Sequence, residues 1–249
     1  MRIILSPTKK MREDPDSLTC GGLPQFLPRT EEILAWLRSR SPEQLQKLWG
    51  CNDAIAAQNL ERLADMDLTT RLTPAICAYE GIAFQYMAPS VFDDGQFDYV
   101  QEHLRILSGF YGVLRPMDGV RPYRLEMQAR AAVGGHRDLY SFWGDSLYRA
   151  VQPEDGVILN LASKEYSKCI EKYLTPDDRF VTCTFAENVD GKLVQKGTFA
   201  KMARGEMVRF LAEHQITEPE GAAAFDRLNF HFREDCSTEN ELIFERIPE

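Results

Sequence analysis

Metal-binding and disulfide patterns are missing from this chain. Its six cysteines include no Cys-x-x-Cys pair, and its four histidines have no metal-ligand spacing to one another or to a cysteine. Free cysteines commonly behave as small buried hydrophobes, so we interpret these six as reduced structural thiols. The sequence accordingly predicts no metal site and no cofactor.

Long hydrophobic runs are missing as well. A membrane-spanning helix needs roughly 20 apolar residues, and the opening Met-Arg-Ile-Ile-Leu-Ser-Pro holds only a short apolar run. Of the 249 residues, 44% are hydrophobic and 27% are charged, which is typical of a globular chain with a substantial core. We therefore expect a cytoplasmic protein that has no membrane partner.

Conventional catalytic motifs are also lacking. The chain has no Gly-x-Ser-x-Gly, no Walker loop, no Gly-x-Gly-x-x-Gly and no His-Glu-x-x-His. This absence weakens an enzymatic function without excluding it, because Asp145, Glu165, Tyr166 and Lys201 could converge in the fold as an acid–base set.

What the sequence does have is a segregated charge. Residues 1–12, 103–130 and 192–209 together hold 14 basic and three acidic residues, whereas the rest of the chain holds 15 basic and 35 acidic residues. A uniformly acidic surface repels nucleic acid, but basic segments that meet in space attract a polyanion to one face. Charge counting leaves open the alternative of three separate, solvated helix faces.

Helix signals dominate the first third of the chain. Ser41-Pro42-Glu43-Gln44 is a capping box with proline at the first helical position. Residues 1–6, by contrast, are predicted to form a short buried strand that Ser6-Pro7 ends.

Strand and helix signals alternate in the second half. Asp190-Gly191 is a two-residue hairpin turn between strands over 179–187 and 192–196. The other predicted elements are a strand over 156–162, helices over 165–173 and 200–214, and strands over 228–232 and 242–246. Because no linker or repeat interrupts the chain, we predict one α+β domain over residues 1–249, with a mixed sheet shared by strands from both ends.

The segment 103–118 has the layout of a helix-hairpin-helix. Apolar residues from Phe97 to Leu107 are spaced as one helix face, and Gly109 and Gly112 form a turn behind them. The turn amides of such a motif bind a phosphate without regard to base sequence. The alternative is a plain helical turn with packing glycines.

Arg115, Arg121 and Arg124 follow in a stretch that is rich in proline and aromatic residues. This setting suits the rigid presentation of guanidinium groups to phosphate. Asp118 and Glu126 lie in the same stretch, so an internal arginine–carboxylate network is equally open. The neighbouring aromatic side chains either pack in the core or stack on an unpaired base.

A second polar cluster lies between the predicted strand over 156–162 and the helix that follows. Ser163 is at a helix start, which is either a simple N-cap or an anion site. Lys201 and Arg204 are three residues apart on one helix face and can act together.

At these residues the sequence resembles the YaaA peroxide-stress protein family. The central block, His-Leu-Arg-Ile-Leu-Ser-Gly-Phe-Tyr-Gly-Val-Leu-Arg-Pro-Met-Asp at 103–118, is too specific for coincidence. The other matching blocks, in family order, are residues 3–9, 122–127, 139–145, 160–166 and 200–205. Thr8 and Met202 stand where the family usually has alanine and lysine, and Met202 removes one positive charge.

The resemblance implies a bacterial cytoplasmic protein with a fold of its own. It also implies a positively charged cleft with a helix-hairpin-helix element, DNA binding, and a role in limiting peroxide damage by lowering unincorporated iron. Direct binding of iron or an iron carrier is disfavoured, because histidine and cysteine are not clustered.

The leading hypothesis is a peroxide-stress protein that holds duplex or distorted DNA without sequence specificity, and that has no obligate protein partner. The predicted DNA-binding residues are Lys9, Arg105, Gly109, Gly112, Arg115, Arg121, Arg124, Ser163, Lys164, Lys168, Lys201 and Arg204. The alternative is an enzyme that acts on a small phosphorylated or nucleotide-like ligand in the same cleft. Its predicted pocket residues are Asp145, Asn160, Glu165 and Tyr166.

Overall fold

An eight-stranded mixed sheet runs through the protein, of which a computed structural model describes residues 1–247. Its strands are β1 (Arg2–Leu5), β3 (Leu104–Ser108), β4 (Gly112–Leu114), β6 (Val157–Asn160), β7 (Arg179–Val189), β8 (Lys192–Val194), β9 (Phe230–Phe232) and β10 (Glu241–Arg246). The strand order is β4-β3-β1-β6-β7-β10-β9, and β8 pairs with β7 beside this path. The prediction that both ends of the chain share one sheet is confirmed.

The centre of this sheet is parallel. β1 pairs with β3 and β6, β6 pairs with β7, and β7 pairs with β10. Parallel strands are covered on both faces, which explains why β1, β3 and β6 are nearly continuous apolar runs. The pairs with β4, β8 and β9 are antiparallel, as is a separate two-stranded sheet of β2 (Thr73–Pro74) and β5 (Gly119–Val120).

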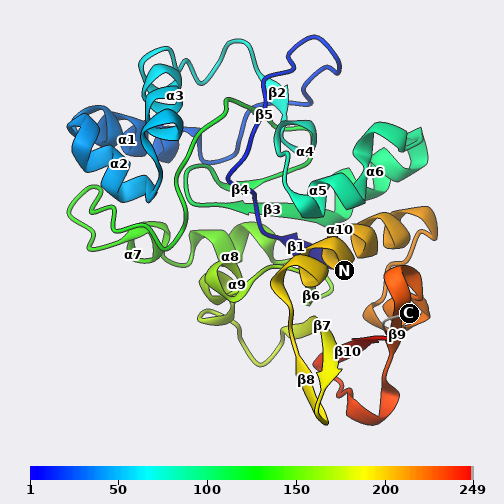
Figure 1. Ribbon diagram of the computed structural model, residues 1–249. Helices are drawn as coiled ribbons and strands as arrows, with labels where there is room; N and C mark the ends of the chain where they lie inside the picture. The colour runs from blue at the N-terminus through cyan, green and yellow to red at the C-terminus, as the bar shows by residue number, and fades with distance from the viewer. Residues whose placement is uncertain (248–249) are drawn as a thin grey trace.

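Helices cover both faces of the sheet (Figure 1). The α-helices are α1 (Leu27–Arg38), α2 (Pro42–Trp49), α3 (Asp53–Ala64), α4 (Ala75–Ala78), α5 (Ile82–Met87), α6 (Asp94–His103), α7 (Leu139–Trp143), α8 (Ser146–Val151), α9 (Lys164–Glu171) and α10 (Gly197–Glu213). Short 3-10 turns are η1 (Pro89–Val91), η2 (Pro219–Ala224), η3 (Arg227–Asn229) and η4 (Glu234–Cys236). α8 and α9 lie on one side of the sheet and α5, α6 and α10 on the other, while α1–α3 form the predicted helical N-terminal third. The α+β class with a mixed sheet is confirmed.

Local sequence signals produced several of these elements as expected. Ser41 and Gln44 form a complete capping box at the start of α2. Asp190 and Gly191 have φ values of 52° and 81°, and they join β7 to β8 as the predicted two-residue hairpin. In residues 1–247, no helix combines the length and the apolar character that a membrane crossing needs.

The helix-hairpin-helix expected at 103–118 is not present. The helix α6 ends at His103, and the next five residues form the buried strand β3, which turns at Gly109 into the antiparallel strand β4. The amides of Phe110 and Tyr111 donate to Ser108 Oγ at 3.2 and 2.9 Å, so they do not face a ligand. The spacing that suggested one long helix face instead joins the end of a helix to a strand whose five residues are all buried.

Gly112 follows the same turn in a conformation that side chains rarely adopt. Its φ is +78°, and a Cβ there would lie 3.0 Å from the rings of Phe26 and Trp143. Gly109 is equally enclosed, because a Cβ there would lie 2.7 Å from the carbonyl oxygen of Leu125. The two glycines therefore serve a tight, buried turn, and they do not bind phosphate as the sequence had suggested.

Candidate functional site

A cavity of about 390 Å³ opens at the carboxyl ends of β1 and β6. After β1 the chain proceeds toward β3, and after β6 it proceeds through α9 to β7 on the other side. The loops after these two adjacent strands therefore diverge and leave a crevice, which is where open parallel sheets bind their ligands. The volume is within the range of roughly 300–1,000 Å³ found for small-ligand sites. We call this space the carboxyl-end cavity.

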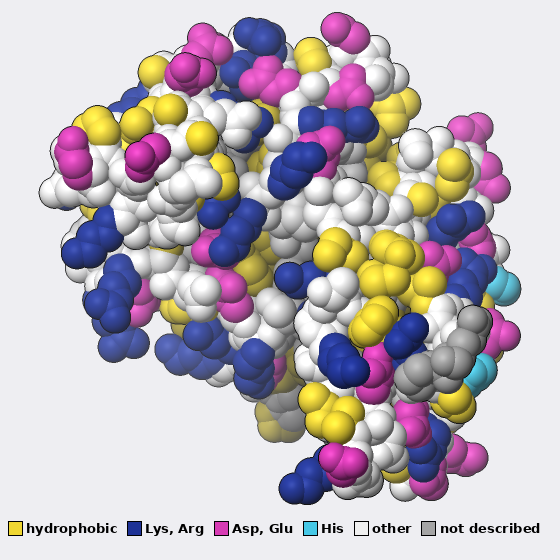
Figure 2. Space-filling model, viewed as in Figure 1, with side chains coloured by type: hydrophobic (Ala, Val, Ile, Leu, Met, Phe, Trp, Pro, Cys, Tyr) yellow, Lys and Arg dark blue, Asp and Glu magenta, His cyan; other side chains and the backbone are white. Residues whose placement is uncertain are grey.

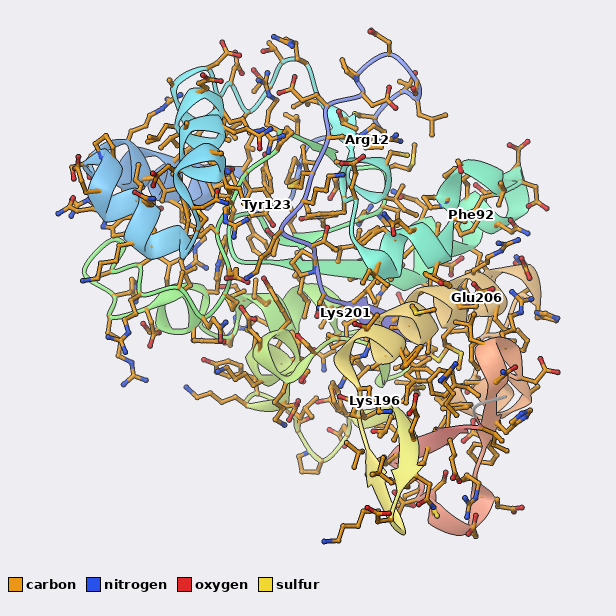
Figure 3. The ribbon with its side chains drawn as sticks, in the orientation of Figure 1. Arg12, Phe92, Tyr123, Lys196, Lys201 and Glu206 are labelled. Atoms are coloured by element: carbon orange, nitrogen blue, oxygen red, sulfur yellow. The ribbon has the colours of Figure 1, made fainter. Side chains whose placement is uncertain are left out.

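Segments far apart in the sequence line the carboxyl-end cavity. They are the loop after β1, the start of α5, the loop after β5, the start of α9 and the first half of α10. Tyr123 and Lys201, labelled in Figure 3, approach the cavity from the loop after β5 and from α10. The polar and aromatic lining residues are Ser6, Thr8, Lys9, Lys10, Tyr123, Arg124, Glu126, Ser163, Glu165, Tyr166, Lys201 and Arg204.

Close helix packing sets the cationic wall formed by α10. A Cβ at Gly205 would lie only 1.8 Å from the carbonyl oxygen of Ala83, so α10 and α5 touch backbone to backbone at this point. Lys201 and Arg204 precede this contact on α10 and face the cavity. The glycine in the Ala-Lys-Met-Ala-Arg-Gly block is thus what allows the two cations to stand beside α5.

The cavity carries more positive than negative charge. Lys9 Nζ lies 2.8 Å from Glu126 Oε1, and Lys10 Nζ lies 3.3 Å from a carboxylate oxygen of Glu80. Arg124, Lys201 and Arg204, by contrast, form no ion pair with any carboxylate that the structure describes. Their positive charges are free to meet an anion. Figure 2 shows Lys and Arg side chains along the band between the N-terminal helices and α10, with Asp and Glu interspersed.

Arg204 is the most enclosed of the three unpaired cations. Burial lowers the pKa of its guanidinium, and its Nε is buried with no hydrogen-bond partner among residues 1–247. A buried Nε–H that lacks an acceptor is poised for an incoming anion, because an unmet donor out of water is costly.

Ser6 and Ser163 connect the two strand ends that form the base of the cavity. The backbone N–H of Ser163 donates to Ser6 Oγ at 2.8 Å, and Ser6 Oγ donates to Ser163 Oγ at 3.1 Å. Ser163 occupies the N-cap position of α9, but its side chain makes no capping hydrogen bond. The N-terminal amides of α9 therefore keep free donor capacity beside the cavity.

A buried chain of hydroxyl groups supports Tyr123 beneath the cavity. Tyr123 Oη is 2.6 Å from Ser108 Oγ and 2.9 Å from Tyr79 Oη. Burial raises the pKa of Tyr123 to about 12 and the pKa of Tyr79 well above its usual value. These phenols are neutral hydrogen-bonding groups at physiological pH and fix the position of the aromatic floor.

Glu165 is the half-buried carboxylate of the site. Its Oε1 accepts a hydrogen bond from the backbone N–H of Gln128 at 3.1 Å, while burial raises its pKa. A carboxylate with a raised pKa beside several cations has the properties of a proton acceptor, which keeps acid–base chemistry within the reach of this site.

Seven of the residues predicted from the sequence meet in the carboxyl-end cavity. They are Lys9, Arg124, Ser163, Glu165, Tyr166, Lys201 and Arg204. The remaining predicted residues lie elsewhere, and the structure shows what each of them contacts.

Three of the predicted site arginines in the 103–130 segment are outside this cavity. Arg105 and Arg115 line a second cavity near the start of β1. Arg121 is buried, with Nη2 at 3.2 Å from a carboxylate oxygen of Glu13 and 3.3 Å from one of Asp65. Arg121 thus takes part in the internal ion-pair network that the sequence left open.

Three further candidates have local partners. Asp145 is ion-paired with Arg149 on α8, and Lys164 with Glu171 on α9. Lys168 Nζ lies 4.0 Å from the ring centre of Tyr140.

Asn160 is buried at the end of β6. Its Oδ1 accepts from the N–H of Ala162, and its Nδ2 donates to Thr182 Oγ1. Asn160 shapes the turn after β6 and does not line the carboxyl-end cavity.

Sequence reasoning missed the lining contributed by Gly81, Ile82 and Ala83. No charge or motif marks this segment. A Cβ at Gly81 would lie 2.2 Å from a methyl carbon of Thr8, so the residue works by leaving room for the loop after β1. Ser6 was also missed as a site residue, although its place directly after a buried strand was a usable signal.

Comparison with known proteins shows the family of this chain. The family described as peroxide stress protein YaaA matches residues 1–236. This chain belongs to that family. A UPF0246 protein of Agathobacter rectalis is 60% identical over 246 residues, covering 99% of both chains. UPF0246 proteins of Lachnoclostridium phytofermentans and Limosilactobacillus reuteri are 54% and 50% identical, covering 98% and 99% of this chain and 96% and 100% of their own.

Metal-ligating side chains are not grouped in the part of this YaaA-family chain that the structure describes. No set of three or more His, Cys, Asp or Glu residues there is placed to hold a metal ion. The chemistry that the cavity offers is the recognition of an anion by guanidinium, ammonium and backbone donors.

Proposed function

We propose that this protein binds DNA through its phosphate groups at the carboxyl-end cavity, without reading base sequence, as its part in the peroxide stress response. In the cell, this binding limits oxidative damage and the pool of free iron. The observation that carries the proposal is the convergence on one concave site of Arg124, Lys201 and Arg204, three cations that have no carboxylate partner among residues 1–247.

Arginine and lysine donors are suited to phosphate. Guanidinium groups offer a planar fork of donors to phosphate oxygens, and lysine adds a compact positive charge. The rest of the chain is acidic, so a polyanion is attracted to this site and repelled from other surfaces. A cavity of this volume admits a phosphate and one nucleotide-sized group, and the remainder of the DNA lies outside it.

A second candidate function is supported by the size of the cavity. About 390 Å³ is sufficient for a small phosphorylated or nucleotide-like ligand. Glu165, whose pKa is raised by burial, would then act as the general base on a ligand held by Lys201 and Arg204.

DNA titration at two salt concentrations tests the main proposal. Duplex, bulged and single-stranded DNA of one composition are each titrated by fluorescence anisotropy. Binding through a few phosphates predicts a log–log salt slope of about −0.9 per phosphate on duplex DNA, with little dependence on base sequence. Lys201→Gln should weaken the binding of every sequence alike and should reduce that slope by about one.

Arg149→Gln provides the matched control. Arg149 is an exposed arginine that does not line the carboxyl-end cavity. The Arg149→Gln substitution should therefore leave DNA affinity nearly unchanged. Salt-insensitive binding, or equal loss in both variants, contradicts DNA binding at this site. Tight binding of mononucleotides together with an absence of DNA binding would instead favour the second candidate.

A further inference from the structure

A second cavity, of about 370 Å³, lies toward the start of β1, away from the carboxyl-end cavity. It is lined by Arg2, Arg105 and Arg115. The register of β1 with β3 places Arg2 two residues before the partner of Arg105, so these two arginines face the same side of the sheet. Arg115 directly follows Leu114, the residue of β4 that pairs with Ile106, and it lines the same cavity. We call this space the arginine cavity.

Arg105 is the centre of the arginine cavity and is only 7% exposed. Its Nη1 donates to the carbonyl oxygens of Gln101 and Leu104 at 3.1 and 2.7 Å. No carboxylate within residues 1–247 lies within ion-pair distance of this guanidinium. A buried arginine is rarely left without an ion pair, because an uncompensated charge out of water is costly.

Arg2 and Arg115 add to the unmet charge. The Nε of Arg2 is buried and has no hydrogen-bond partner in the described part of the chain, while its Nη1 donates to the carbonyl oxygen of Glu102. The guanidinium of Arg115 forms no ion pair in the described chain.

Among the described residues, Asp118 is the single carboxylate that lines the arginine cavity. Its Oδ2 accepts from the backbone N–H of Arg115 at 2.8 Å. Three guanidinium groups face one carboxylate, so the walls of the cavity carry an excess of about two positive charges.

We infer that the arginine cavity binds a small, doubly charged oxyanion of the phosphate class, at a site separate from the carboxyl-end cavity. The arginine forks match the oxygens of such an ion, and its two negative charges balance the excess on the walls. Burial first, and then repulsion from Arg2 and Arg115, lowers the pKa of Arg105 to about 10, while Asp118 and Glu102 act in the opposite direction.

Calorimetric titration of inorganic phosphate into the full chain at constant ionic strength tests this site. The titration is made in the Lys201→Gln background, because the carboxyl-end cavity is itself cationic. The Lys201→Gln variant should still bind phosphate in the arginine cavity. Adding Arg115→Gln to this variant should weaken phosphate binding at least tenfold. Arg115 is exposed, so this substitution does not threaten folding.

Two further variants sharpen the result. Arg149 is the exposed arginine of α8 and does not line the arginine cavity. Adding Arg149→Gln should therefore leave phosphate affinity within about twofold. Arg105→Gln should abolish phosphate binding, with thermal melting confirming that the variant is folded. A parallel titration with adenosine monophosphate distinguishes a free phosphate from the phosphate of a nucleotide. If the arginine cavity excludes the base, inorganic phosphate binds and adenosine monophosphate does not.

DNA titrations of the same variants separate this site from the proposed function. Arg115→Gln in the otherwise unchanged chain should leave DNA affinity intact. The inference is overturned if phosphate does not bind in the Lys201→Gln background, if Arg115→Gln leaves phosphate affinity unchanged, or if it weakens DNA as much as phosphate. A complete absence of DNA binding would overturn the proposed function and would leave the phosphate result as it stands.

Discussion

The two cavities at opposite ends of β1 both gather cations, but they differ in the elements that supply these cations and in the carboxylates that balance them. The carboxyl-end cavity gathers cations from loops and helices, and part of its charge is balanced by Glu126 and Glu80. The arginine cavity takes its cations from β1, β3 and the residue that follows β4, and Asp118 is the only carboxylate in its lining among residues 1–247. The comparison shows that one basic stretch of sequence, 103–130, is divided by the fold between two separate sites and the core.

The contact between α10 and α5 is where the carboxyl-end cavity is most easily destroyed. Gly205→Ala places a methyl group against the backbone of Ala83 and should lower the free energy of unfolding by about 3 kcal/mol, because two packed backbones must separate. Denaturant unfolding measures the effect. Gly197→Ala, on the same helix, meets no atom within 4 Å and should change stability little. Equal effects of the two substitutions would show that the helices do not touch at Gly205.

Arg121 and Arg124 test whether neighbouring arginines belong to different regions. Arg121→Gln removes a buried partner of Glu13 and should cost about 2 to 3 kcal/mol of stability, with DNA affinity retained in the folded protein. Arg124→Gln should weaken DNA binding and leave stability nearly unchanged. Arg124 lines the carboxyl-end cavity and has no ion pair in the described residues. Thermal melting and anisotropy on both variants provide the comparison, and a shared phenotype would place both arginines in one network.

Asp118 makes the arginine cavity sensitive to pH. Burial raises its pKa to about 6, against the lowering effects of Arg115 and Arg105. An acid with a raised folded-state pKa contributes stability below its unfolded pKa and loses it as pH rises through the folded value. The free energy of unfolding should therefore fall by about 2 kcal/mol from pH 4 to pH 7 relative to Asp118→Asn.

Denaturant unfolding of wild type and Asp118→Asn across this pH range measures that difference. Asp145→Asn, which removes an exposed carboxylate on α8, is the control. If wild type and Asp118→Asn follow parallel pH curves, Asp118 is not the buried acid of the arginine cavity.

The smallest expected effect concerns the floor of the carboxyl-end cavity. Tyr123→Phe removes the hydroxyl that joins Ser108 to Tyr79 and should cost about 1 kcal/mol of stability. The ring stays in place, so DNA affinity should change little. A large loss of DNA affinity with unchanged melting would instead mean that the hydroxyl contacts the ligand directly.

Short-range signals in the sequence determined much of the fold. The capping box at Ser41, the Asp190-Gly191 turn and the apolar runs of β1 and β6 depend on neighbouring residues, so they were predictable without the rest of the chain. The same reasoning failed over 103–118. A strand that is buried on both faces has no alternation of polar and apolar residues, so its spacing resembles a helix face.

The sequence by itself therefore determined the supply of basic residues and the principal strands and helices. Only the tertiary structure decided which cations share a cavity, because that depends on strand order and on close contacts such as Gly205 against Ala83. In the fold, Lys9, Arg124, Lys201 and Arg204 lie at the carboxyl ends of β1 and β6. Arg105 and Arg115 lie near the start of β1, and Arg121 forms an internal ion pair. Electrostatic partners are set by distance in space, and the number of residues between two charges does not fix that distance.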